Sequence, residues 1–364
     1  MPATEPPIVS PLALEEARSA VPVLRRFAYL NAGTFGPLAT TTVDAVQGEL
    51  ERDLREGRSG LPYFVRTMEL RQMMRLRLAA FVGADPLQVA LTGSTTDGCN
   101  IVLAGLGLGP DDEIVTTTDE HFGLLGPLGT SRARVIVADP DPESILAAVT
   151  PRTRLLALSQ VLWTTGRILP LGELREATGV PILVDGAQSV GAIPVAAAVF
   201  DFLTISGQKW LCGPDSTGAL IVADPERLQV TSPSYFSQAT YEPNGSFEPR
   251  EGAARFEPNW WPSSSLAGLL AAIEARPVWA FDQAAAVAER CRALLATRAE
   301  VVTLDPCSTL VAFRAPGEPA ALVETLLAEG VHVREIPGQG LIRVSCGWWT
   351  SDGDLDRLLA ALPA

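Results

Sequence analysis

Short runs of apolar residues recur through the middle of the chain and are bounded by turn-forming or charged residues. A run of four such residues, as at 181–184, is typical of a strand that is buried on both faces. The segments between the runs are helical or loop-like, which favours a mostly parallel sheet in an α/β fold. The pattern predicts strands at residues 88–92, 112–118, 133–138, 154–159, 181–185, 201–205 and 217–223.

The rest of the chain predicts helices, loops and a second unit. Residues 229–263 are rich in Ser, Pro, Gly, Tyr and Trp, which indicates long functional loops. Predicted helices span residues 11–20, 40–56, 62–82, 95–106, 264–298 (interrupted near Pro277), 318–329 and 353–362, with further strands at 331–335 and 341–345. We therefore expect an N-terminal helical segment that joins the small domain (1–25), a large α/β domain (26–265) and a small C-terminal α+β domain (266–364).

The composition excludes several classes of function. The 364 residues carry 28 Lys and Arg against 42 Asp and Glu, a formal net charge of −14. Such a surface repels phosphate backbones and anionic lipid, so neither nucleic acid nor a membrane is an expected partner. Five widely spaced cysteines without a C-x-x-C pair indicate reduced thiols and a cytoplasmic protein. With only two histidines and no His–Cys cluster, no metal site is expected.

Lys209 is the only lysine in the chain, whereas arginine occurs 27 times. Arginine can replace lysine wherever a permanent surface charge is enough, but it cannot supply a primary amine that attacks a carbonyl. Lys209 follows the predicted strand 201–205, and ligands bind at the carboxyl ends of strands in open α/β sheets. Apolar surroundings there would disfavour the charged amine and raise its nucleophilicity.

Other polar groups are expected at the same edge. Asp185 ends a predicted strand, where its carboxylate could pair with a protonated ring nitrogen. Thr95 and Thr96 open a helix after a glycine turn, and the free N–H groups of a helix start suit a phosphate. Plain structural roles are open too, because Asp185 can cap a turn and the threonines can cap the helix. An amine, a carboxylate and a phosphate cradle at strand ends together match the needs of pyridoxal phosphate (PLP).

The segments Asp185-Gly-Ala-Gln188 and Ser206-Gly-Gln-Lys209-Trp210, at this spacing, resemble the class V aminotransferase family of fold-type I PLP enzymes. This group includes cysteine desulfurases, isopenicillin N epimerase-like proteins and cysteine/cystine C–S lyases. Similar stretches run from residue 29 to residue 345 and into the closing helix. The resemblance implies a mostly parallel seven-stranded sheet flanked by helices, a small α+β domain, PLP as the cofactor, an amino-acid substrate and a homodimer.

Carried over residue by residue, the resemblance implies that Lys209 holds PLP through a Schiff base and moves the Cα proton. His121 corresponds to the imidazole that stacks on the cofactor ring, and it is expected to be catalytic with Lys209. Asp185 corresponds to the partner of the ring nitrogen and Gln188 to the ligand of the ring hydroxyl. The expected phosphate ligands are Thr95, Thr96, Ser206 and Gln208, and the expected substrate-pocket residues are Asn31, Ala32, Gln160 and Arg343, of which Arg343 grips the α-carboxylate.

Departures from the family pattern favour one reaction over the others. Cysteine desulfurases need a nucleophilic cysteine shortly before the carboxylate arginine, but residues 333–342 contain none. Residues 161–166, 209–214 and 343–346 are similar to C–S lyases, which implies β-elimination from a cysteine-derived or other sulfur amino acid. Transamination or epimerisation on the same cofactor, and a non-catalytic ligand-binding protein, are the alternatives. Trp260 and Trp261 either shape an apolar pocket or simply pack.

Overall fold

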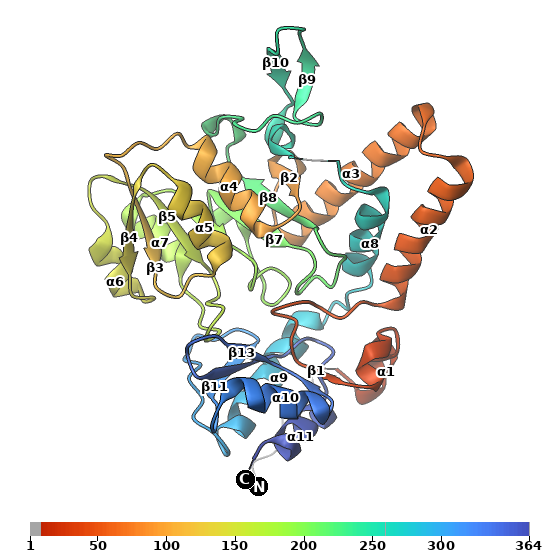
Figure 1. Ribbon diagram of the computed structural model, residues 1–364, viewed down its shortest axis with the longest axis vertical. Coiled ribbons are helices and arrows are strands. Elements are labelled where there is room, and N and C mark those ends of the chain that lie inside the picture. Colours follow the sequence, from red (N-terminus) through yellow and green to blue (C-terminus); the bar gives the residue numbers. More distant parts are fainter. Residues whose placement is uncertain (1–8, 259, 364) are drawn as a thin grey trace.

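The apolar runs of the central chain form a seven-stranded sheet, as the sequence predicts (Figure 1). The computed structural model describes residues 9–258 and 260–363. The strand order is β2-β8-β7-β6-β5-β3-β4; β8 is antiparallel to both neighbours, and the other strands run parallel to one another. The strands are β2 (Val89–Thr92), β3 (Glu113–Thr117), β4 (Arg134–Ala138), β5 (Thr153–Ser159), β6 (Ile182–Asp185), β7 (Phe202–Ser206) and β8 (Gly218–Val222).

Both faces of the sheet are buried, which explains why its strands are continuously apolar. In β5, Leu156 and Leu158 belong to the apolar cluster on one face, and Leu155 and Ala157 to the cluster on the other. The first cluster includes side chains of α3 (Gly60–Val82), α6 (Pro142–Ala148), α7 (Leu171–Thr178) and α8 (Ser263–Glu274); the second includes those of α4 (Thr95–Gly105) and α5 (Phe122–Thr130).

The segment 229–263 contains more regular structure than the predicted loops. Strands β9 (Gln238–Tyr241) and β10 (Phe247–Pro249) form an antiparallel hairpin that projects from the top of the molecule in Figure 1. Asn244-Gly245 lies at its tip, with Gly245 at a φ of +87°. An Asn-Gly pair is a strong hairpin signal, but the surrounding Pro and Ser residues obscured the strand alternation.

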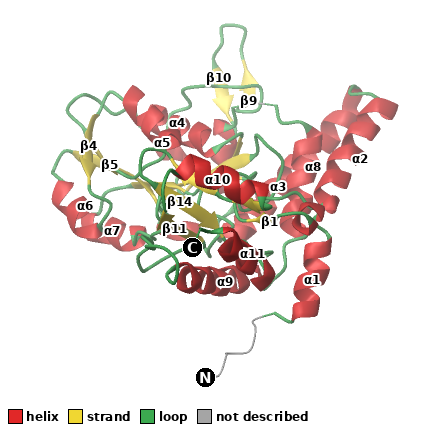
Figure 2. Ribbon diagram, turned by 60° about the horizontal axis from the view of Figure 1, so that its bottom comes forward, coloured by secondary structure: helices red, strands yellow, loops and turns green. Residues whose placement is uncertain are grey.

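The C-terminal part forms a three-stranded antiparallel sheet, in the order β11-β14-β13, surrounded by helices (Figure 2). The strands are β11 (Leu310–Arg314), β13 (Arg334–Ile336) and β14 (Leu341–Ser345), and the helices are α9 (Ala280–Leu295), α10 (Pro319–Ala328) and α11 (Asp352–Ala361). The predicted interruption near Pro277 is confirmed, because α8 ends at Glu274 and α9 begins at Ala280.

The N-terminal part contacts this C-terminal sheet. After α1 (Pro11–Ser19), strand β1 (Ala28–Tyr29) pairs in parallel with β12 (Val331–His332), and α2 (Thr40–Glu56) then packs against α8. Residues 1–8 of the expected N-terminal segment lie outside the described residues, and the domain boundaries stay a prediction. In the part of the chain that the structure describes, no helix is both long and apolar enough to cross a bilayer.

Candidate active site

Several parallel strands of the large sheet end at one edge, and the segments that follow them carry most of the predicted site residues. Their order follows from the sheet topology. Thr95 follows β2, His121 follows β3, Gln160 follows β5, Asp185 is the last residue of β6, and Lys209 follows β7. The structure therefore brings these side chains to a single sheet edge, where ligands of open α/β sheets bind.

The amine of Lys209 lies in a setting that favours its neutral form. Burial lowers the pKa of Lys209 to about 8, and the positive charges of Arg343 and Arg334 act in the same direction, while Asp185 opposes them. No hydrogen bond holds this amine among the described residues. A free amine with a lowered pKa suits a nucleophile or a proton-transfer base.

The lowered pKa of Lys209 predicts how cofactor attachment depends on pH. Only the neutral amine attacks a carbonyl, and at pH 7 about a tenth of it is neutral if the pKa is about 8, against about 0.03% for an ordinary lysine. The rate of PLP attachment to cofactor-free protein should therefore rise with pH and level off above about pH 8.5. Stopped-flow absorbance measures this rate; a tenfold rise per pH unit up to pH 10 would contradict the assignment.

Asp185 and Gln188 occupy the turn that follows β6. The carboxylate of Asp185 is buried, and its Oδ1 accepts a hydrogen bond from the Ala187 N–H at 2.9 Å. The Gln188 amide is held at both ends: Nε2 donates to the Gly33 carbonyl at 2.8 Å, and Oε1 accepts from the Trp210 indole at 3.0 Å. One N–H of the Gln188 amide therefore remains for a ligand. This agrees with the expected contact to the ring hydroxyl, which stays a prediction.

The predicted phosphate ligands lie at the start of α4 and the end of β7. Ser94 caps α4, and its hydroxyl accepts from the Asp97 N–H at 3.1 Å. The backbone N–H groups of Thr95 and Thr96 have no partner among the described residues, as expected for the first turn of a helix. Nearby, the Ser206 hydroxyl donates to Gln208 Oε1 at 3.0 Å. Unpaired N–H groups and hydroxyls are the donors that a phosphate needs.

His121 caps α5 and stands between Thr96 and Trp163. Its Nδ1 accepts from the Gly123 N–H at 3.0 Å, and its ring meets the Trp163 ring edge-on at 5.2 Å. A Cβ added at Gly123 would lie 2.9 Å from Thr96 Oγ1, so the turn after β3 closely approaches the start of α4. Burial and the nearby charge of Lys209 lower the pKa of His121, which keeps its imidazole neutral at pH 7.

Arg343 on β14 is almost fully buried and is paired with no carboxylate among the described residues. Nη1 donates to the Trp163 carbonyl at 2.8 Å, whereas Nε and Nη2 are buried and have no partner in the described part of the chain. Burial lowers the pKa of Arg343 to about 9, with a contribution from the charge of Arg334, so the guanidinium remains charged at pH 7. A buried charge without a counter-ion is costly unless an anion binds to it.

A second arginine, Arg334, was not among the predicted site residues; it lies directly opposite Arg343 in the β13–β14 pair. Its Nη1 donates to the Thr34 hydroxyl at 3.1 Å, and its guanidinium carbon lies 6.0 Å from the centre of the Trp163 ring. No carboxylate pairs with it in the described part of the chain. Since like charges directly opposite each other destabilise a strand pair, this arrangement indicates a site for more than one anionic group.

The remaining predicted pocket residues differ in their surroundings. Asn31 Oδ1 accepts from the Thr34 hydroxyl at 2.8 Å and so connects to Arg334. Gln160 has a buried Oε1 without a partner. Ala32 is fully buried in an apolar cluster that includes Trp210 and Val161, so its side chain packs in that core. The expected substrate contacts of these three residues stay predictions.

Aromatic residues near the site mostly pack against one another. Trp261 is buried in the core of the large sheet, so it packs rather than shaping a pocket. Trp260 is partly exposed and contacts Tyr63, Tyr235 and Phe236.

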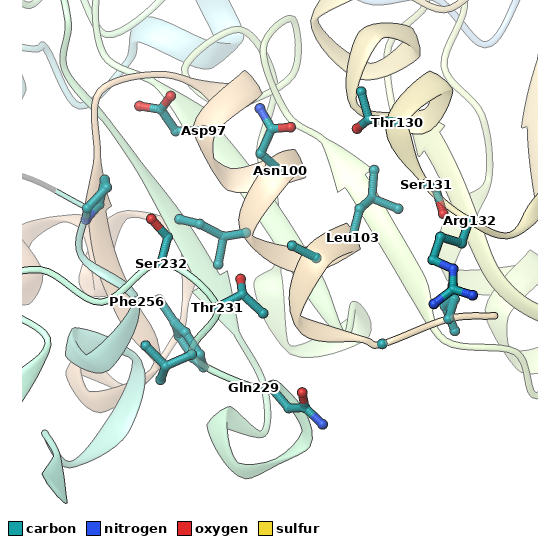
Figure 3. A pocket seen from close by; sticks show the side chains of 16 residues that line it. Asp97, Asn100, Leu103, Thr130, Ser131, Arg132, Gln229, Thr231, Ser232 and Phe256 are labelled. Carbon is teal, nitrogen blue, oxygen red and sulfur yellow. The ribbon is translucent and has the colours of Figure 1, made fainter. Parts of the chain in front are cut away.

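A cavity of about 470 Å³, lined by residues other than those of the predicted site, borders α4 (Figure 3). Its lining includes Asp97, Asn100 and Leu103 of α4, together with Arg132 and the segment around Thr231. None of the predicted site residues lines it. The cavity is therefore separate from the strand-end site.

The strand-end residues fit PLP as a cofactor. The free amine of Lys209, the buried carboxylate of Asp185 and the unpaired N–H groups of α4 offer a group for the aldehyde, the ring nitrogen and the phosphate, respectively. The neutral imidazole of His121 could stack on the ring between them.

Comparison with known sequences supports this interpretation. The family model described as "Aminotransferase class-V" matches residues 29–353. Isopenicillin N epimerase from Streptomyces clavuligerus is 31% identical over 96% of this chain and 98% of its own length. A probable cysteine desulfurase from Pseudomonas aeruginosa is 31% identical over 79% of this chain and 80% of its own.

Solved structures agree with the sequence comparison. A mutant of C-DES with glycine covalently linked to the PLP cofactor superposes with a TM-score of 0.86 at 26% identity and covers 94% of this chain and 98% of its own. The complex between the cystine C–S lyase C-DES and its reaction product cysteine persulfide gives a TM-score of 0.85 at 26% identity over 93% and 98% of the two chains. Fold and cofactor thus agree with the expectation, and the chain belongs to the class V aminotransferase family of PLP-dependent enzymes.

Proposed function

We propose that the protein is a C–S lyase that cleaves the Cβ–S bond of a sulfur amino acid by β-elimination. The observation that carries this proposal is the connection between β13 and β14, which spans only residues 337–340 and contains no cysteine. The nearby Cys346 is fully buried, and its contact with Cys291 and burial raise its pKa well above the ordinary value. A cysteine desulfurase, which needs a thiolate nucleophile beside the carboxylate arginine, is therefore disfavoured.

Each residue of the site has a defined task in such a reaction. PLP, when bound, supplies an electron sink that acidifies the Cα proton of the substrate. Arg343 would bind the α-carboxylate, Asp185 would pair with the ring nitrogen, and the Lys209 amine would take the Cα proton. The Cβ–S electron pair leaves with sulfur, and the remaining aminoacrylate hydrolyses to pyruvate and ammonia.

Arg334 favours a substrate that carries a second anionic group. A cystine-like disulfide has a second carboxylate, and its leaving group is a persulfide, which departs more readily than a simple thiolate. Similarity to the structure described as a cystine C–S lyase supports the same substrate class.

The charge of Arg334 gives a testable prediction about substrate choice. Arg334→Met should raise KM for cystine about tenfold or more, because a charge-assisted hydrogen bond is lost. It should change KM less than about threefold for S-methylcysteine, which has no second carboxylate. An equal change in KM for both substrates would show that Arg334 does not bind a second anionic group.

Epimerisation is the second candidate, because the isopenicillin N epimerase relative aligns over almost the whole chain. It uses the same proton transfer at Cα but returns the proton to the other face and releases no sulfur. A homodimer and a cytoplasmic location are further parts of the proposal; size-exclusion chromatography with light scattering tests the dimer.

The proposal is tested by following pyruvate and sulfide release from purified holoenzyme. The panel contains cysteine, cystine, cysteine conjugates and their sulfoxides. Pyruvate from at least one of them is expected, and the rates identify the preferred leaving group. Conversion of the cofactor to pyridoxamine phosphate without pyruvate would identify an aminotransferase, and an inverted substrate would identify an epimerase.

A further inference from the structure

Glu120 is a buried carboxyl group that has no role in the proposed reaction. It lies between β3 and the N-cap residue of α5, and only 4% of its surface is exposed. Three donors satisfy it: the Ser159 N–H at 2.9 Å and the Thr117 hydroxyl at 3.1 Å bind Oε1, and the Ser159 hydroxyl binds Oε2 at 2.5 Å. The carboxyl group thus joins the turn after β3 to the last residue of β5.

Other contacts tie the same two segments together. The Thr164 hydroxyl donates to Asp119 Oδ2 at 3.1 Å, and the rings of His121 and Trp163 meet edge-on. His121 has an extended backbone, with φ −76° and ψ 150°. Since Glu120 and His121 are consecutive residues, the hydrogen bonds that hold Glu120 also restrain the backbone from which the His121 side chain projects.

We propose that Glu120 is a positioning residue: it ties the turn that carries His121 to the end of β5 and thereby fixes the imidazole against the cofactor. This inference rests on the proposed contact of His121 with PLP, but not on the identity of the reaction. Within the described residues, the His121 side chain makes one hydrogen bond, which it accepts from the Gly123 N–H of its own helix. The attachment to strand β5 is therefore provided by the neighbouring residue, Glu120.

The buried surroundings of Glu120 and its hydrogen bonds shift its pKa in opposite directions. Burial raises the pKa of Glu120 to about 7, and the nearby charge of Asp185 adds to this effect, while Ser159 and Thr117 oppose it. Glu120 in turn acts on Cys99 of α4, whose pKa burial and the charges of Asp185 and Glu120 raise well above the ordinary value. Glutamine at position 120 keeps the shape and an acceptor oxygen, whereas alanine removes the anchor completely.

The test is a double-mutant cycle on holoenzyme, read out by the affinity for PLP and by the visible circular dichroism of the bound cofactor. Glu120→Ala should weaken PLP binding about tenfold and reduce the dichroism, and Glu120→Gln should stay within about twofold of the wild type. In a His121→Ala background, Glu120→Ala should cause no further loss, because its effect passes through His121. These readouts do not depend on which substrate is cleaved, so a failure of the lyase proposal would not affect them.

Glu113 provides a matched control at the other end of β3. It is also buried, and it accepts from the Thr150 hydroxyl at 2.5 Å and from Arg152 Nη2 at 2.6 Å. Glu113→Ala should lower Tm without changing the PLP affinity or the dichroism. An equal loss of PLP affinity in Glu113→Ala, or losses in Glu120→Ala and His121→Ala that multiply in the double variant, would overturn the inference. If Glu120→Ala does not fold, Ser159→Ala replaces it in the double-mutant cycle with His121→Ala. The expected loss of PLP affinity is then about threefold.

Discussion

Replacing Lys209 with alanine is expected to lower kcat by at least about 10³-fold, because in the proposed reaction one side chain supplies both the cofactor attachment and the proton-transfer base. No other side-chain amine can substitute for it, since Lys209 is the only lysine in the sequence. The Asp185 carboxylate and the N–H groups of α4 that we expect to bind the phosphate would still be present, so the variant should still bind PLP reversibly. Steady-state assays with the preferred substrate measure the loss.

The single lysine also allows a direct chemical control. Borohydride reduction of the wild-type holoenzyme should fix the cofactor on the peptide that contains Lys209, and the Lys209→Ala protein should carry no label on any internal residue. Lys209→Arg keeps a positive charge but has no amine that deprotonates near neutral pH, so it should be as inactive as the alanine variant. Retained activity in either variant would contradict the assignment of Lys209.

Replacing Arg343 with methionine is expected to lower kcat/KM by about 10²-fold or more, mainly through KM. The guanidinium is buried, and its Nε and Nη2 have no partner among residues 9–258 and 260–363, so these two nitrogens can bind a carboxylate. Losing one partner of a buried, hydrogen-bonded charge pair typically costs about 2–5 kcal/mol of binding free energy. Steady-state kinetics with an unmodified amino acid measures the effect.

The stability of the Arg343→Met protein distinguishes a binding role from a structural one. A buried charge without a counter-ion destabilises the fold, so a methionine of similar volume should leave the Tm of the cofactor-free protein unchanged or raise it. Higher stability combined with lost substrate affinity would match a site built for an anion. A large fall in Tm with an unchanged KM would show that Arg343 only holds the Trp163 loop in place.

The central sheet could be predicted from the sequence because its signal is local. The run at residues 181–184 is apolar since β6 is buried on both faces, and Asp185 marks the end of the strand. The β9–β10 hairpin was missed because its strands are short and β10 ends in Pro249. Helix α5 escaped prediction for a similar reason, since it is rich in glycine and contains Pro127.

The site could be predicted only where a residue belongs to a continuous motif. Lys209 and Asp185 stand at strand ends within such motifs, and the fold brings them to one edge. Arg334 and Glu120 depend on partners that are distant or that lie on another strand: Arg334 faces Arg343 across a hairpin, and Glu120 binds Ser159, 39 residues away. The short connection between two predicted strands at residues 331–345 was the one signal that could have placed Arg334 opposite Arg343.

The most direct test of the central claim is to identify the products that the holoenzyme forms from L-cystine, using NMR with the Lys209→Ala protein as the blank. The account predicts one pyruvate and one ammonia per Cβ–S bond cleaved, together with cysteine persulfide, and none of them from the variant. Alanine in place of pyruvate would indicate desulfuration, and D-cystine or meso-cystine without pyruvate would indicate epimerisation. Either result would contradict β-elimination while leaving PLP as the cofactor.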